Sequence, residues 1–383
     1  MKKKYDFSKK IKLAEELFKK GDLNKADNIY KDLFKYKVYT YDLLISCALF
    51  NKNINRYKVA KDLLNLSLRK YPKGIKSYLL LSEILSDERD FKAAKNLLLV
   101  AEEIDKNNSF VHYRLGILYL TNKNYEKAIK SIDNALFINP DKKEYIILKA
   151  DILFNKTDYK KALNLLSKIN IENPSYLFLQ RELLLSKIYL NISDFNKAET
   201  TLLNLKSVFK TEKIIFLTLS NLYFQIKDLK KGISILQEGL NLYPSFLPFK
   251  FNLAVMYRNS GDIKLAIKSH LEIIKIDNSY LDSYYELSSL YDFKFHKKEL
   301  ELFLNIDFDK LSSSQKIKAF FSKSNIFHNL KEYNKSSYYL KMANEEKLKL
   351  FPSDLELKKN TGELYKKLFL EKKKQDFKIK KEI

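Results

Sequence analysis

The chain has 383 residues, with 71 Lys and Arg against 47 Asp and Glu, which gives a formal net charge of +24 at pH 7. It contains only 7 Gly and 6 Pro, so it is poor in turn residues, and this argues against a β-sandwich and against Gly-rich phosphate loops. The single cysteine excludes a disulfide framework and any cysteine-based zinc or iron–sulfur site. With 45% hydrophobic residues, the chain is too apolar for disorder.

The first twenty residues are basic, but no apolar core follows the lysines, so they do not read as a secretory signal. No stretch approaches the ~18 consecutive apolar residues that a membrane-spanning helix needs. We therefore expect no membrane span and a cytoplasmic location.

Small residues recur along the chain at intervals of 34, with one step of 36. The first column is Ala26, Ala60, Ala94, Ala128, Ala162, Ala198, Gly232 and Ala266. A second small column lies twelve residues upstream: Ala14, Ala48, Ser82, Gly116, Ala150, Ser186, Ser220 and Ala254. A bulky column lies three residues before the first: Leu23, Tyr57, Phe91, Tyr125, Tyr159, Phe195, Leu229 and Ile263. Such agreement indicates internal repeats.

Each repeat predicts two helices of about 12–15 residues, which are marginal alone in water. The small residues would let the two helices approach closely, and we expect the bulky column to fill the space beside each contact. One helix pair cannot bury its apolar face, so successive pairs must stack. The Gly-Asp steps at Gly21 and Gly261 predict the turn between the two helices of their units.

At these positions the chain resembles the tetratricopeptide repeat family over roughly residues 7–280. Residues 109–142 match the family pattern at Leu115, Gly116, Tyr119, Tyr125, Ala128, Ala135 and Pro140, and residues 247–280 at Leu253, Ala254, Tyr257, Gly261 and Ala266. The family's first Trp is absent, Asn51 occupies a Tyr position and Gly232 replaces a core Ala. The resemblance implies an all-α fold, a right-handed α-solenoid of stacked helical hairpins.

The pattern divides the chain into four parts. These are a basic N-terminal arm (1–6), eight tetratricopeptide units (7–280), a degenerate helical region of the same kind (281–351) and a lysine-rich C-terminal helix or tail (352–383). Within the third part we expect a ninth first helix at 282–293, an amphipathic helix at 296–305, and a capping box at Ser312 with Gln315. From Ile317 the repeat spacing returns, with Ser324 and Ser336 in the small positions.

Residues 247–365 are also similar to the region that connects tetratricopeptide arrays to a C-terminal sulfotransferase domain in bacterial proteins. The similarity lies in the order of an Asn-Leu-Ala repeat, "YYELSSLYDF", a non-repeat helix and "EYNKSSYYLKMANEEK". No Gly-rich phosphate loop follows before Ile383. The resemblance therefore implies descent from, or truncation of, such an architecture, and not activity.

No residues form a recognisable catalytic or metal-binding motif, so we predict no enzyme activity, no cofactor and no metal site. The four histidines, His112, His270, His296 and His328, contain no pair at helical spacing. Cys47 adjoins the small residue Ala48, which predicts a buried, inert thiol.

The family resemblance places positions 2, 5, 9 and 12 of each unit on the concave surface of the solenoid. A partly aromatic groove at these positions suits a peptide or a partner helix. The candidate groove residues are Phe110, Tyr113, Ile117, Leu120, Leu217, Asn221, Phe224, Phe251, Val255 and Arg258.

These features leave three functions open. The leading one is a non-catalytic scaffold that binds a protein or peptide, of unknown identity, in its concave groove. The second is the regulatory or substrate-presenting part of a truncated or split sulfotransferase. The third is a lysine-rich nucleic-acid binder, which the scarcity of Arg disfavours, because Arg is the usual reader of phosphates and bases.

Overall fold

The computed structural model describes residues 7–290, 293–308 and 311–351. Within these ranges the regular elements are helices and no strand occurs. The chain splits into two compact units, residues 1–208 and 209–383, and each is described by itself. The predicted arm (1–6) and C-terminal tail (352–383) lie outside the described residues.

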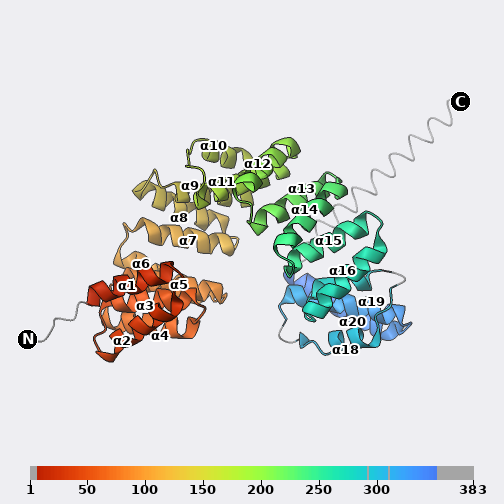
Figure 1. Cartoon of the computed structure of the whole chain (residues 1–383), viewed down its shortest axis with the longest axis horizontal. Coiled ribbons are helices and arrows are strands. Elements are labelled where there is room, and N and C mark those ends of the chain that lie inside the picture. Colours follow the sequence, from red (N-terminus) through yellow and green to blue (C-terminus); the bar gives the residue numbers. More distant parts are fainter. Residues whose placement is uncertain (1–6, 291–292, 309–310, 352–383) are drawn as a thin grey trace, which may run out of the picture. The chain divides into compact units, whose positions relative to one another are not determined.

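The first unit is a succession of six helical hairpins (Figure 1). The two helices of each hairpin pack together, and each hairpin packs on the next. In order, the helices are α1 (Phe7–Lys19), α2 (Leu23–Lys35), α3 (Tyr41–Asn53), α4 (Tyr57–Lys70), α5 (Ile75–Asp87), α6 (Phe91–Ile104), α7 (Ser109–Thr121), α8 (Tyr125–Ile138), α9 (Lys143–Asn155), α10 (Tyr159–Ser167), α11 (Tyr176–Asn191) and α12 (Phe195–Val208).

The second unit begins with two hairpins of the same kind and ends with a less regular part. Its helices are α13 (Lys213–Gln225), α14 (Leu229–Leu242), α15 (Leu247–Asn259), α16 (Ile263–Ile276), α17 (Leu281–Ser288), α18 (Lys297–Leu304), α19 (Ser313–Asn329) and α20 (Tyr333–Leu350). Among the described residues the molecule is an all-α solenoid of stacked hairpins, as predicted.

The two columns of small residues lie where the helices of each hairpin meet. Every member of both columns is buried. Gly116 shows how close the approach is: a Cβ atom there would lie 3.4 Å from Leu148 Cδ2 and 3.7 Å from the Ala128 carbonyl oxygen. At Gly232 the Met256 side chain occupies the space that a Cβ atom would need, because its Sδ would lie 2.4 Å from an added Cβ. The prediction of close helix contacts at these columns is confirmed.

The bulky column lies at the start of the second helices, beside the helix contacts. Its residues are the first residues of the second helices, from Leu23 in α2 to Ile263 in α16. Most are half-buried, and Leu23 and Ile263 are exposed. Four of the half-buried members pack against the hydrophobic cores of their hairpins, and there the expectation that they fill the space beside the helix contacts is confirmed: Tyr57, Phe91, Tyr125 and Tyr159. A residue in the first turn lies at the end of the packed interface, so its other side faces solvent.

The turn inside the hairpins has one recurring conformation. Gly21 and Gly261 have φ of +82° and +88°, as glycine allows. Seven residues at the equivalent turn also have positive φ, although each carries a side chain: Asn55, Arg89, Lys123, Thr157, Ser193, Lys227 and Lys331. At Thr157, the amide N–H donates to the Phe154 carbonyl, and the N–H of Asp158 donates to the Leu153 carbonyl. This is the Schellman motif that ends a helix.

The residue after that turn caps the second helix. The Asp158 side chain accepts a hydrogen bond from the Lys161 amide, three residues ahead, and Asp22, Asp90, Asn124 and Asp228 make the same bond in their hairpins. Asp and Asn are strong N-cap residues because their side chains satisfy amides that have no partner within the helix. Each inner turn therefore ends one helix and starts the next within three residues.

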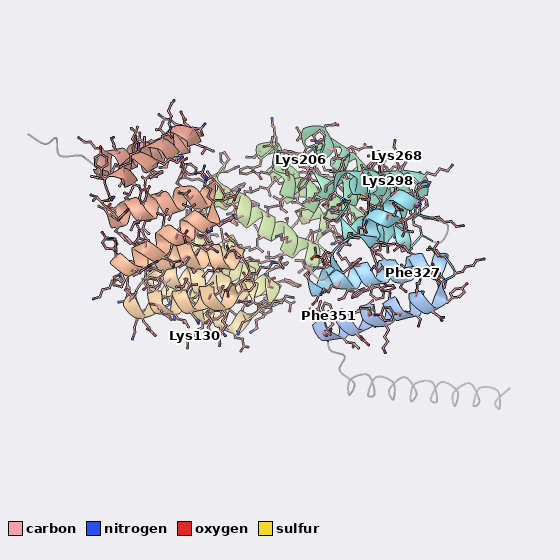
Figure 2. The ribbon with its side chains drawn as sticks, turned by 90° about the horizontal axis from the view of Figure 1, so that it is seen from below. Lys130, Lys206, Lys268, Lys298, Phe327 and Phe351 are labelled. Atoms are coloured by element: carbon pink, nitrogen blue, oxygen red, sulfur yellow. The ribbon has the colours of Figure 1, made fainter. Side chains whose placement is uncertain are left out.

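The C-terminal region follows the predicted order of helices. Helix α17 begins where the ninth first helix was predicted but ends at Ser288, earlier than expected, and α18 falls within the predicted amphipathic segment. The Ser312–Gln315 capping box is present at the start of α19. In the last hairpin the Ser324 hydroxyl donates to the Ser336 carbonyl over 3.0 Å. Phe327 lies on α19 and Phe351 lies just beyond the end of α20 (Figure 2).

Candidate functional site

The ten candidate groove residues lie on first helices, four on α7 and six on α13 and α15. None of the ten is fully buried: Phe110 and Asn221 are exposed and the others are half-buried. They belong to different compact units, so each set is described separately.

A large hollow lies in the first unit, on the first helices of four successive hairpins. It has a volume of about 710 Å³ and is lined by α1, α3, α5 and the start of α7. We call it the N-terminal groove. Its lining residues are Phe7, Ser8, Ile11, Lys12, Glu15, Thr40, Asp42, Ile45, Ser46, Leu49, Lys76, Leu79, Leu80, Glu83, Phe110 and Arg114.

The lining of the N-terminal groove is partly apolar and open to solvent. Leu49 is 42% exposed and Phe110 is 45% exposed, whereas Ile11 and Leu79 are buried and form part of the unit's core. Apolar side chains that stay exposed next to a hollow are typical of contact sites. This surface can therefore take apolar side chains of a partner.

One wall of the groove carries a chain of hydrogen bonds. The Ser46 hydroxyl donates to Glu15 Oε1 over 2.8 Å, which leaves the Tyr30 hydroxyl, 2.6 Å away, to donate to Ser46. Burial raises the pKa of Tyr30 to about 12, so it keeps its proton at neutral pH. This network holds the Glu15 carboxylate at the edge of the groove.

The lining also includes an acidic residue, Glu83, that pairs with two cations. Glu83 lies 2.8 Å from Lys52 Nζ and 3.0 Å from Arg114 Nη2. Burial favours the neutral acid, but hydrogen bonds and charge from these two cations outweigh it and lower the pKa of Glu83. Lys12 and Lys76 also line the groove, and no ion pair joins either of them to an acidic group among the described residues.

The α7 candidates do not lie together in one groove. Phe110 reaches the N-terminal groove, and Tyr113 lies with it on a neighbouring hollow of about 660 Å³ beside the turn before α9. The Tyr113 ring stacks on Tyr145 at a centroid distance of 4.8 Å. Ile117 lines a smaller hollow next to α5, and Leu120 packs against the core of its hairpin.

In the second unit three candidates, Asn221, Phe224 and Val255, share a hollow of about 190 Å³ between α13 and α15. The Phe251 ring packs edge-on against His270 at 5.6 Å. Arg258 forms an ion pair with Glu286 of α17. Leu217 is half-buried on α13, outside this hollow. The structure therefore brings together only part of the predicted set.

The predicted site residues do not include most of the N-terminal groove, although the rule that places positions 2, 5, 9 and 12 on the concave surface applies there too. Positions 2, 5 and 9 of the first three units are Ser8, Ile11, Glu15, Asp42, Ile45, Leu49, Lys76, Leu79 and Glu83, and all nine line the groove. The predicted candidates lie in later units, whose inward positions include aromatic residues such as Phe110, Tyr113 and Phe251. The signal that could have found the groove is the same position rule, applied from the first unit.

Groups with catalytic potential are sparse in the described part of the chain. Cys47 is buried, and burial raises the pKa of its thiol to about 12. Among the described residues, no group of three or more His, Cys, Asp or Glu side chains could hold a metal ion. In the same ranges, no helix is both long enough and apolar enough to cross a membrane.

Comparison with known proteins agrees with the geometry. The model of the family described as "Tetratricopeptide repeat" matches residues 109–142. Protein O-mannosyl-transferase TMTC3 of Homo sapiens is 25% identical over an alignment of 301 residues, and the match covers 73% of this chain and 33% of that protein. The chain thus spans about a third of the length of this curated relative.

Two solved structures show the same fold. A tetratricopeptide repeat protein from Parabacteroides merdae has a TM-score of 0.52 at 15% identity, over 69% of this chain and 99% of that one. A monomeric IFIT1 mutant with Gppp-AAAA has a TM-score of 0.50 at 15% identity, over 88% of this chain and 89% of that one. At such identities the likeness concerns the fold alone.

Proposed function

We propose that this chain, a tetratricopeptide repeat protein, is a non-catalytic scaffold that holds a segment of a partner protein in the N-terminal groove. The observation that supports the proposal most is the groove itself, because four successive first helices contribute to one continuous, partly apolar hollow. Exposed apolar groups in a hollow of this size suit several side chains of a peptide. A cytoplasmic location stays a prediction from the sequence.

The charged lining indicates which peptide would fit. The lining contains three basic groups, Lys12, Lys76 and Arg114, and three acidic ones, Glu15, Asp42 and Glu83. Arg114 and Glu83 pair with each other, while both lysines lack an acidic partner among the described residues. A peptide that fits would have apolar side chains and at least one carboxylate. Its apolar side chains would pack against Leu49 and Phe110, and its carboxylate would pair with Lys12 or Lys76.

The test is selection of binders from a library of random dodecapeptides displayed on phage, using the full chain as bait. Selected peptides should be apolar with an acidic residue. Leu49→Asp should weaken their binding at least tenfold, because it places a charge where an apolar side chain is buried. The matched control is Leu203→Asp on α12, which changes a leucine of similar exposure (44%) outside the groove and should leave binding unchanged. Equal binding by both variants would refute the proposal.

Nucleic acid is a second candidate partner, favoured by the net charge of +24 and by the likeness in fold to IFIT1, which was solved with Gppp-AAAA. The balanced charges of the N-terminal groove oppose RNA binding in that groove. Binding of a labelled oligouridylate that weakens steeply with salt would support this candidate. If the oligouridylate does not bind at 50 mM salt, nucleic acid is excluded as the partner.

An alternative within this proposal is that the chain acts together with a transferase domain. The curated relative is named as a mannosyl-transferase, and two thirds of it lie outside the length matched here. The predicted link to a sulfotransferase stays a prediction. A transferase domain encoded directly beside this reading frame would support such a role.

A further inference from the structure

Apolar or aromatic side chains recur at one position of the N-terminal groove, once in each hairpin. The four members of this series are 34 residues apart and lie on the first helices α1, α3, α5 and α7: Ile11, Ile45, Leu79 and Tyr113. The first three line the N-terminal groove, and the fourth lines the neighbouring hollow, which shares Phe110 with the groove. We call these four residues the apolar track.

The apolar track forms the floor of the groove. Ile11 and Leu79 are only 6% and 8% exposed, and Ile45 is half-buried. Leu49 and Phe110, which line the same groove, are much more exposed. A segment that lies in the groove would therefore meet one apolar contact on the floor for each helix that it crosses.

The packing of the first helices sets the spacing of these contacts. Helix α3 packs on both α1 and α5, and α5 packs on α7 (Figure 1). The axes of packed helices are about 8–10 Å apart, so successive residues of the track are separated by about the same distance. A segment that runs from α1 to α7 crosses three such steps, a length of about 24–30 Å.

Among the regular backbone conformations, polyproline II matches this spacing best. It has three residues per turn and rises about 3.1 Å per residue, so every third side chain lies on the same face, about 9.3 Å apart. A β-strand repeats each face at about 6.8 Å, which is too short. An α-helix is about 10–12 Å wide, which is too wide for a hollow of about 710 Å³ that extends over four helices.

The chemistry of the lining favours the same conformation. Polyproline II segments dock on aromatic-lined grooves, and the rings of Phe110 and Tyr113 lie together at the α7 end, with a centroid distance of 5.7 Å. Proline has no N–H group, so it needs no acceptor from an apolar floor. Lys12 and Lys76, which have no acidic partner among the described residues, complement a carboxylate on the segment.

We propose that the N-terminal groove binds a partner segment in the polyproline II conformation, with an apolar residue at every third position and a carboxylate that pairs with Lys12 or Lys76. Four apolar residues within about ten positions would contact the apolar track in turn. This proposal rests on the proposed function, to which it adds the conformation and the residue spacing of the partner segment.

The test compares two fluorescein-labelled peptides of equal composition, by fluorescence anisotropy with the full chain. In the first peptide, Leu-Pro-Glu-Leu-Pro-Ser-Leu-Pro-Ser-Leu-Pro-Ser, leucine recurs at every third position. In the second, Leu-Pro-Leu-Ser-Leu-Pro-Leu-Glu-Pro-Ser-Pro-Ser, leucine recurs at every second position. The first peptide should bind at least tenfold more tightly. Replacement of its four prolines by alanine should weaken binding at least threefold, because the free peptide is then less preorganised.

A pair of variants tests the apolar track itself. Ile45→Ala, in the middle of the track, should weaken binding of the first peptide at least fivefold. The matched control is Ile146→Ala on α9, a half-buried isoleucine outside both hollows, which should leave binding unchanged. Equal effects of the two variants would overturn the proposal.

The peptide comparison also separates this proposal from the proposed function. Equal binding of the two peptides, or no binding of the first, would overturn the polyproline II proposal. If Leu49→Asp weakened both peptides to the same extent, the groove would still hold a peptide, and only the conformation and spacing proposed here would be wrong.

Discussion

Replacing Thr157 with glycine should stabilise the first unit, because this threonine occupies the turn between α9 and α10 with a φ of 66°. A residue with a side chain pays about 1–2 kcal/mol in the left-handed region, and a β-branched one is especially unfavourable there. Glycine has no such cost in this region, but its greater conformational entropy in the unfolded chain lowers the stability by about 0.5–1 kcal/mol. The net gain should be about 0.5–1 kcal/mol.

Urea denaturation followed by helical circular dichroism measures the effect. With an m value of about 2 kcal/mol/M, the gain corresponds to a rise in midpoint of about 0.25–0.5 M. The reverse control is Gly261→Ala, at the equivalent turn of the second unit with a φ of +88°. An added Cβ there meets nothing within 4 Å, so any loss comes from the backbone alone and should be about 1 kcal/mol. A lower midpoint for Thr157→Gly, or an unchanged one for Gly261→Ala, would refute the reasoning.

Three further predictions concern packing and buried ionisable groups. Gly239→Ala should lower the free energy of unfolding by about 1–3 kcal/mol, because the added Cβ would lie 2.7 Å from the fully buried ring of Phe249. Gly232→Ala should lower it less in the same urea assay, because the added Cβ there meets the flexible side chain of Met256. Burial raises the pKa of Asp151, so its ionisation destabilises the folded chain. This destabilisation is absent below the unfolded pKa of 3.8, grows as the pH rises toward the folded pKa and is complete above it. Asp151→Asn should therefore raise the urea midpoint at pH 7 but not at pH 3. Cys47, buried and with a raised pKa, should react with a disulfide reagent at pH 8 about 100-fold more slowly in the folded chain than in 6 M guanidinium; equal rates would contradict its burial.

The hairpins could be predicted from the sequence because their packing depends on residues at fixed spacing. A small residue at Ala26 or Ala60 is required wherever two helix backbones approach closely, so the fold repeats the requirement every 34 residues. The turn conformation was predicted only at Gly21 and Gly261. At Thr157 the same turn carries no glycine, so only the repeat spacing, which aligns Thr157 with Gly21, points to the turn there; the geometry of the hairpin imposes the positive φ.

The candidate site was harder to predict because a groove depends on several hairpins at once. Tyr113 occupies a predicted inward position, yet its ring stacks on Tyr145 and helps to form a neighbouring hollow. Whether an inward side chain is free depends on the length and direction of its neighbours in the next hairpin, which no single repeat encodes. A smaller hollow lined by Glu102, His112 and Phe137 lies where α6 ends, α7 begins and α8 ends, outside the positions that the family pattern marks.

The most direct test of the central claim is amide hydrogen exchange of the full chain, measured by mass spectrometry with and without a saturating peptide from the phage selection. The account predicts that the peptide slows exchange in α1, α3 and α5 and at the start of α7, the helices that line the N-terminal groove. Protection confined to the second helices α2, α4 and α6, or to the second unit, would contradict it.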